Sequence, residues 1–209
     1  MVLPHGIYTL SFRQDKRRSG GMLASLQKGR RVNGGWKSLV GRDYTLVDIA
    51  SSIDTDDETG DDNQAHWIAG QIYEAARHLR LPVNAAAVLV YSSSVGEPLA
   101  EALSSQGLPA RFMNSSQFDL DEPCIKVTTL HAAKGLEFPI VVVAHVEAGR
   151  LPRETEATDP EEVAAHLAEQ RRLFYVGCTR AMRHLFVTYD HQIPSPFLAD
   201  LSDERWQRM

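Results

Sequence analysis

Apolar residues follow two different periods along this chain. Short runs rich in apolar and β-branched residues, bounded by polar clusters, predict strands at 7–13, 44–49, 86–91, 110–113, 125–130, 140–144 and 184–189. Apolar residues at helical spacing predict helices at 64–80, 96–106 and 161–182. Residues 86–91 are apolar throughout, which is typical of a strand buried on both faces of a sheet.

Alternation of strands and helices predicts an α/β fold, a parallel sheet flanked by helices on both faces. With 209 residues and 43% hydrophobic content, the chain can bury one core, so we expect a single domain over 1–209. Its core is expected at 7–190, with a solvated acidic loop at 51–63 and a tail at 191–209. Ligands of such sheets gather beyond the carboxyl ends of the strands, and we expect residues 131–138 to lie there.

Composition excludes several classes of protein. The formal net charge of -5 argues against coating duplex DNA by charge alone, although a narrow basic track on one face is still compatible with it. Cys124 and Cys178 are too few for a disulfide framework and fit a reducing compartment. No apolar run is long enough to span a membrane, and the first residues lack a signal pattern. We therefore expect a soluble, cytoplasmic protein with no membrane partner.

A first motif follows the strand predicted at 125–130. Its residues fit the pattern T-x-H-x-[SA]-K-G-L-E, at Thr129, His131, Lys134, Gly135, Leu136 and Glu137. The motif resembles one in the second motor lobe of UvrD/Rep-type superfamily 1 DNA helicases, a RecA-like domain. The resemblance implies that Gly135 and Glu137 contact ATP and that Thr129 and His131 contact single-stranded DNA. Lys134 is either a contact to DNA phosphate or a member of an internal ion pair.

A second motif lies on the helix predicted at 161–182. Residues 172–181 read R-L-F-Y-V-G-C-T-R-A and resemble the R-L-x-Y-V-x-x-T-R-A motif of the same lobe. The resemblance implies that Arg180 is an arginine finger, since a planar guanidinium can stabilise charge that develops on the transferred phosphoryl group. Arg172 and Tyr175 are expected to brace the helix, and Cys178 is expected in the core.

Weaker similarities extend the resemblance to residues 8–190. Residues 10–14 resemble an aromatic-arginine motif, which implies that Arg13 is a second catalytic arginine at the terminal phosphate of ATP. The alternative for Arg13 is an ion pair with the acidic loop. Residues 147–152 resemble an E-G-L-(F/L)-P turn, and residues 87–103 resemble a segment that ends in an acidic helix.

The chain also departs from the family in three places. It contains no G-x-x-x-x-G-K-[ST] phosphate loop, so the Mg²⁺ that accompanies ATP would be held by a first lobe, in cis or in trans, and not by this chain. Three serines at 92–94 stand where the family often has Arg and Asn; Ser93 is still expected to contact DNA, without the strength of a charged group. About a dozen residues, 114–124, replace the inserted 2B subdomain.

Two functions follow from this reading. The first is the C-terminal motor lobe of an ATP-dependent superfamily 1 DNA helicase, which supplies an arginine finger and single-stranded DNA contacts and is inactive alone. The alternative is a non-catalytic nucleic-acid-binding or protein-interaction module derived from such a lobe. The sequence leaves open whether the chain is a natural short protein or part of a longer one.

Overall fold

The computed structural model describes residues 7–11, 31–32, 35–36, 43–48, 60–116, 118–190, 192–201 and 207–208, with side chains described within residues 64–201. The helices are α1 (Gly60–Leu79), α2 (Ser93–Ser105) and α3 (Pro160–Cys178), with short 3₁₀ helices η3 (Val83–Ala85) and η4 (Pro196–Asp200). The strands are β1 (Ile7–Ser11), β2 (Arg31–Val32), β3 (Gly35–Trp36), β4 (Asp43–Asp48), β5 (Ala86–Val90), β6 (Ala110–Phe112), β7 (Ile125–Thr129), β8 (Phe138–Val143), β9 (Ala181–Tyr189) and β10 (Gln207–Arg208).

A parallel sheet forms the centre of the fold. Its strand order within the described residues is β1-β10-β4-β9-β8-β5-β7-β6. The strands β9, β8, β5, β7 and β6 all run in the same direction, and β4 joins them in parallel beside β9. β1 is antiparallel to β4. The expected α/β fold with a parallel sheet is therefore confirmed.

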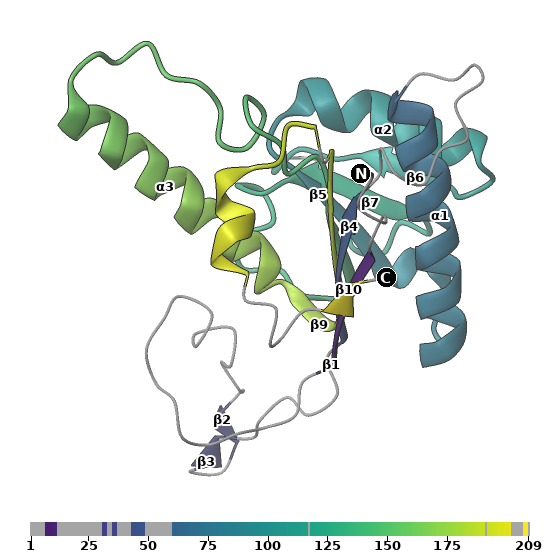
Figure 1. Ribbon diagram of the computed structural model, residues 1–209. Helices are drawn as coiled ribbons and strands as arrows, with labels where there is room; N and C mark the ends of the chain where they lie inside the picture. Colours follow the sequence, from purple (N-terminus) through teal and green to yellow (C-terminus); the bar gives the residue numbers. More distant parts are fainter. Residues whose placement is uncertain are drawn as a thin grey trace, which may run out of the picture.

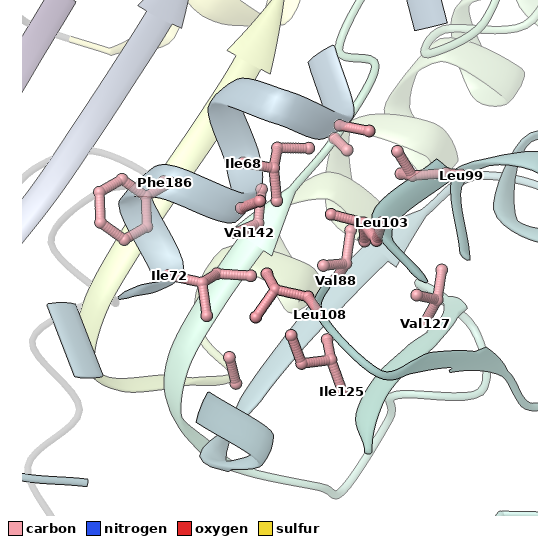
Figure 2. Packing of buried hydrophobic residues seen from close by; sticks show 14 of the residues in the cluster. Ile68, Ile72, Val88, Leu99, Leu103, Leu108, Ile125, Val127, Val142 and Phe186 are labelled. Atoms are coloured by element: carbon pink, nitrogen blue, oxygen red, sulfur yellow. The ribbon is translucent and has the colours of Figure 1, made fainter. Parts of the chain in front are cut away.

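Helices cover both faces of this sheet, as the alternating pattern predicts (Figure 1). α1 and α2 pack on one face, where Ile68, Ile72 and Leu103 are fully buried against Val88 and Ile125 (Figure 2). α3 covers the other face, where Phe174 and Cys178 pack with strand residues that include Leu89. All residues of β5 are buried, because this strand is central and has helices on both sides.

Three helix boundaries differ from those expected. α1 begins at Gly60, so residues 60–63 belong to its first turn and not to an acidic loop; residues 51–59 lie outside the described residues. α2 begins at Ser93, three residues early. α3 ends at Cys178, four residues short of the expected end, because Ala181 pairs with Phe138 as the first residue of β9. Strand pairing thus outweighs the helical periodicity of this segment.

Part of the segment after residue 190, expected as a tail, is packed on the core. Phe197 in η4 is 1% exposed and stacks on Phe174 of α3. Arg171 lies over the Phe197 ring and pairs with Asp200 at 2.9 Å. This segment therefore extends the buried core beneath α3. None of the helices in the described ranges combines the length and the apolarity needed to cross a membrane.

Candidate functional site

The first motif runs from one edge of the sheet to the other. β7 and β8 are both parallel to β5, so the carboxyl end of β7 and the amino end of β8 lie at opposite edges. Residues 130–137 connect these two ends. The expectation that the whole segment 131–138 lies beyond the carboxyl ends is therefore wrong. Only its start lies there, and its last residues reach the amino edge of the sheet.

The carboxyl edge carries the residues expected to contact DNA. Thr129 ends β7, and His131 follows it and is exposed. The ring of His131 lies 6.4 Å from the ring of Tyr91, which follows β5. Ser93 is exposed and is the first residue of α2, not part of a loop before that helix. These side chains come from the ends of two neighbouring strands, so the structure brings them to the same edge.

Local hydrogen bonds fix the path of the crossing segment. The Thr129 hydroxyl accepts from the backbone N–H of Ala132 at 3.2 Å, and the N–H of Lys134 donates to the His131 carbonyl at 3.2 Å. Gly135 has φ +89°, a left-handed conformation that glycine adopts without steric cost, so the backbone turns sharply there. The side chains of Lys134 and Glu137 are exposed. Their roles toward DNA and ATP stay predictions.

Arg180 lies at the amino edge, in the two-residue turn between α3 and β9 and not on the helix. The Arg180 carbonyl accepts from the N–H of Phe138 at 2.9 Å, so Glu137 and Arg180 occupy matching positions directly before the adjacent strands β8 and β9. The Arg180 guanidinium donates to the Leu136 carbonyl at 3.2 Å, the Val176 carbonyl at 2.9 Å and the Thr179 hydroxyl at 2.8 Å. The two motifs are thus joined through Arg180.

A close contact between the two motifs explains the glycine at position 177. Gly177 is buried in α3, and a Cβ atom there would overlap the Cδ2 atom of Leu130. Leu130 is itself fully buried. The absence of a side chain at Gly177 therefore lets α3 lie directly on the start of the crossing segment.

Nothing in the sequence predicts a set of hydrogen bonds between α3 and residue 153, directly after the turn at 147–152. Gln170, which is 3% exposed, accepts from the Arg153 N–H at 2.6 Å and donates to the Arg153 carbonyl at 3.2 Å. His166, one helical turn earlier, also contacts the Arg153 carbonyl, at 3.1 Å. A glutamine among charged residues of a helix gives no signal of this role. The contact fixes the position of α3 relative to the turn that leaves β8.

Buried charges lie in the same turn. The Glu147 carboxylate, 5% exposed, is 3.4 Å from His145 Nδ1 and 3.5 Å from Arg150 Nε. The Arg150 guanidinium also contacts the His145 ring. Burial of a carboxylate is tolerated when charged or polar partners surround it. This cluster secures the carboxyl end of β8. The spacing of Glu147 and Arg150 is the only sequence signal for it.

The two cysteines are not candidate nucleophiles. Burial raises the pKa of the Cys178 thiol well above its ordinary range, and burial also raises the pKa of Cys124. A raised pKa keeps the thiol protonated and unreactive. Cys178 packs in the core, as expected. Tyr175 is partly buried against the same core, and burial raises the pKa of its phenol.

Arg13, the second arginine expected at the ATP phosphates, lies outside the described residues. Among the residues that are described, no three His, Cys, Asp or Glu side chains are grouped so that they could hold a metal ion.

These features define the class of the domain, a RecA-like α/β lobe with one motif crossing its sheet and a second motif anchored on that crossing. Comparison with known proteins then gives the family. Residues 113–192, which contain both motifs, match the model of the UvrD-like helicase C-terminal domain. The resemblance expected from the sequence is therefore confirmed over these residues.

Individual relatives agree with this family. The chain is 36% identical over 117 residues to DNA helicase II of Escherichia coli strain K12, which covers 51% of this chain and 15% of that protein. It is 40% identical over 113 residues to the ATP-dependent DNA helicase UvrD1 of Mycobacterium leprae strain TN, which covers 50% of this chain and 14% of that protein. The chain thus matches only about a seventh of the length of these relatives.

A solved structure has a similar fold. It is the C-terminal domain of a possible DNA helicase from Lactobacillus plantarum WCFS1, with a TM-score of 0.52 and 21% sequence identity. The alignment covers 90% of this chain and 95% of that one. At this identity the comparison supports the fold alone.

Proposed function

We propose that this chain is the second motor lobe of an ATP-dependent superfamily 1 DNA helicase or translocase. ATP with Mg²⁺ would bind between its amino edge and a first lobe that holds the metal, while single-stranded DNA would cross its carboxyl edge. The relatives are DNA helicases, and the Mycobacterium leprae protein is named as ATP-dependent, which supports ATP and DNA as ligands. A cytoplasmic location is part of the same proposal.

The observation that carries the proposal is the position of Arg180 beside the end of the first motif. Its guanidinium donates to Leu136, whose neighbour Glu137 is the residue expected at the nucleotide. Within the described part of the chain, the three hydrogen bonds of the Arg180 guanidinium go to uncharged oxygens. A phosphate oxygen is a stronger acceptor for guanidinium than a carbonyl. Lobe closure on ATP would therefore exchange these contacts for contacts to the γ-phosphate.

The segment that crosses between the two edges could couple DNA binding at one edge to ATP binding at the other. The crossing segment begins at the DNA-facing residues and ends at the nucleotide-facing ones. Gly177 places α3 against Leu130 at the start of that segment, and Arg180 follows α3 directly. If DNA binding moves the crossing segment, the contact between Leu130 and Gly177 would move α3, and Arg180 at the end of α3 would move with it.

The test is ATP hydrolysis by the purified chain, with and without single-stranded DNA, alone and mixed with a first lobe from the same genome. We expect no turnover alone and DNA-stimulated turnover on mixing, because a first lobe supplies the phosphate loop. Turnover by the chain alone would contradict the proposal, since it would require a phosphate site in this chain.

The alternative is a nucleic-acid-binding or interaction module without catalysis. The serines at 92–94, which replace charged and amide groups at the carboxyl edge, favour it. An absence of ATP turnover in the mixture with the first lobe, together with retained DNA binding, would support this alternative.

A further inference from the structure

Two aromatic rings meet at the carboxyl edge of the sheet, on neighbouring strand ends. Tyr91 is the first residue after β5 and His131 is the second after β7, and their ring centroids lie 6.4 Å apart with the planes inclined by 65°. The two backbones are joined at this point, since the Leu130 N–H donates to the Val90 carbonyl at 2.8 Å. We propose that Tyr91 and His131 form a binding site for a nucleobase of single-stranded DNA, with Tyr91 as the stacking residue.

Packing makes Tyr91 a rigid platform. One part of its side chain packs against the core beneath α3, and the side chain as a whole is only partly buried. His131 beside it is exposed. A ring that folding already holds in place loses little conformational entropy when a base stacks on it. The pair therefore offers an ordered aromatic surface at the edge where DNA is expected.

The charge pattern at this edge favours a base over a phosphate as the partner of these residues. Residues 91–95 and 129–133, which carry the two rings, contain no lysine or arginine, and the next residue along the chain, Lys134, is exposed. The formal net charge of the chain is -5, so general attraction to phosphate is weak. Stacking on an aromatic ring tolerates any base and does not require positive charge. Tyr91 would thus replace part of the grip that a charged loop provides elsewhere.

This inference rests on the proposed function for the presence of DNA at the carboxyl edge, and it adds the part of the nucleotide that is bound. The experiment compares two fluorescein-labelled strands of equal length, oligo(dT) and an abasic deoxyribose-phosphate strand, by anisotropy with the full chain. Both strands carry the same phosphates, so the ratio of their dissociation constants isolates the contribution of the bases.

We expect the wild-type chain to bind oligo(dT) more tightly than the abasic strand. Tyr91→Ala should weaken binding of oligo(dT) about tenfold and leave binding of the abasic strand unchanged. Tyr91→Phe should keep the wild-type ratio, because the stacking face is retained and only the hydroxyl is lost. Tyr73→Ala is the matched control: Tyr73 is also a partly exposed tyrosine, but it lies on α1, and its removal should change neither constant.

Four results would overturn the site, of which the first three concern the ratio of the two dissociation constants. The first is equal binding of both strands by the wild-type chain. The second is equal weakening of both strands by Tyr91→Ala, in a variant whose thermal unfolding matches wild type. The third is loss of the preference for oligo(dT) in Tyr91→Phe as well as in Tyr91→Ala. An absence of binding to either strand would overturn it as well. The proposed function fails separately: it is contradicted when base discrimination persists but mixing with a first lobe gives no ATP turnover. Turnover without base discrimination would remove the stacking site alone.

Discussion

The two edges of the sheet differ in chemistry, although one motif connects them. At the carboxyl edge, exposed or partly exposed hydroxyl, imidazole and phenol groups come from separate strand ends, as with Ser93, His131 and Tyr91. At the amino edge, a guanidinium is held by two carbonyls and a hydroxyl of its own chain, at Arg180. The carboxyl edge presents hydroxyl and aromatic groups, which can bind a base of any sequence. The amino edge holds a permanently charged guanidinium.

Under the proposed function, the difference indicates how one small lobe would bind two ligands. A group that must meet DNA of any sequence benefits from exposure and from stacking, which tolerates every base. A group that must act only when a phosphate arrives benefits from being held until then, since a free guanidinium would also bind other anions. The predictions below test this contrast, starting with the largest expected effect.

Replacement of Arg180 should separate catalysis from binding at the amino edge. In the enzyme formed with a first lobe, Arg180→Ala should lower the ATP turnover number about 10³-fold, the size of effect typical of arginine fingers, with nucleotide binding nearly intact. Arg77→Ala is the control, because Arg77 is exposed on α1 and pairs with its neighbour Glu74. Stopped-flow binding of a fluorescent ATP analogue and steady-state turnover measure the two quantities. A loss of affinity as large as the loss of turnover would count against the finger.

A methyl group at Gly177 should damage the contact that joins the two edges. Gly177→Ala places a Cβ atom against buried Leu130, and overpacking of this kind typically lowers the free energy of unfolding by about 1–3 kcal/mol. Gly70→Ala is the matched control. Gly70 lies inside α1 with open space around it, so alanine there should stabilise by up to about 1 kcal/mol. Urea unfolding followed by circular dichroism would measure both; equal stability of the two variants would mean that α3 does not rest on Leu130.

Removal of the imidazole at the carboxyl edge should affect only the response to DNA. His131→Ala should reduce DNA-stimulated turnover about tenfold, the equivalent of about 1.4 kcal/mol of lost DNA binding, and leave basal turnover unchanged. His66→Ala serves as control because His66 is exposed on α1, where it contacts Gln106. Titration of turnover against oligo(dT) separates the two rates. A proportional fall in both would remove the DNA-contact role of His131.

Alkaline pH should reveal the burial of Cys178. Burial raises the pKa of the Cys178 thiol in the folded state above its unfolded value of about 8.5. Above that pH the unfolded chain loses the thiol proton while the folded chain keeps it, so the free energy of unfolding falls as pH rises. Between pH 7.5 and 9.5 we expect the free energy of unfolding to fall by about 1 kcal/mol from this group. The fall should be smaller in Cys178→Ala, compared in a Cys124→Ser background because burial raises the pKa of Cys124 too. Equal slopes in the two chains would contradict it.

The sequence alone determined the class of fold and the residues worth testing. Apolar runs and helical spacing located the parallel strands from β5 to β9 and the three helices, because burial on one or both faces of an element leaves a period in the sequence. The two motifs pointed to the helicase family, which the match over residues 113–192 confirms. The left-handed turn at Gly135 was also readable from the residue type, since few other residues adopt that conformation.

Only the tertiary structure decided which residues share an edge. Thr129 and Glu137 are eight positions apart in one motif, yet parallel pairing of β7, β5 and β8 sends them to opposite edges. The same pairing ends α3 at Cys178, so that Arg180 lies in a turn, and it brings Tyr91 beside His131 from a strand forty residues away. Local sequence encodes the period of each element but not its neighbours. Strand order, and with it the separation of the two edges, depends on long-range pairing that no single stretch of the chain contains.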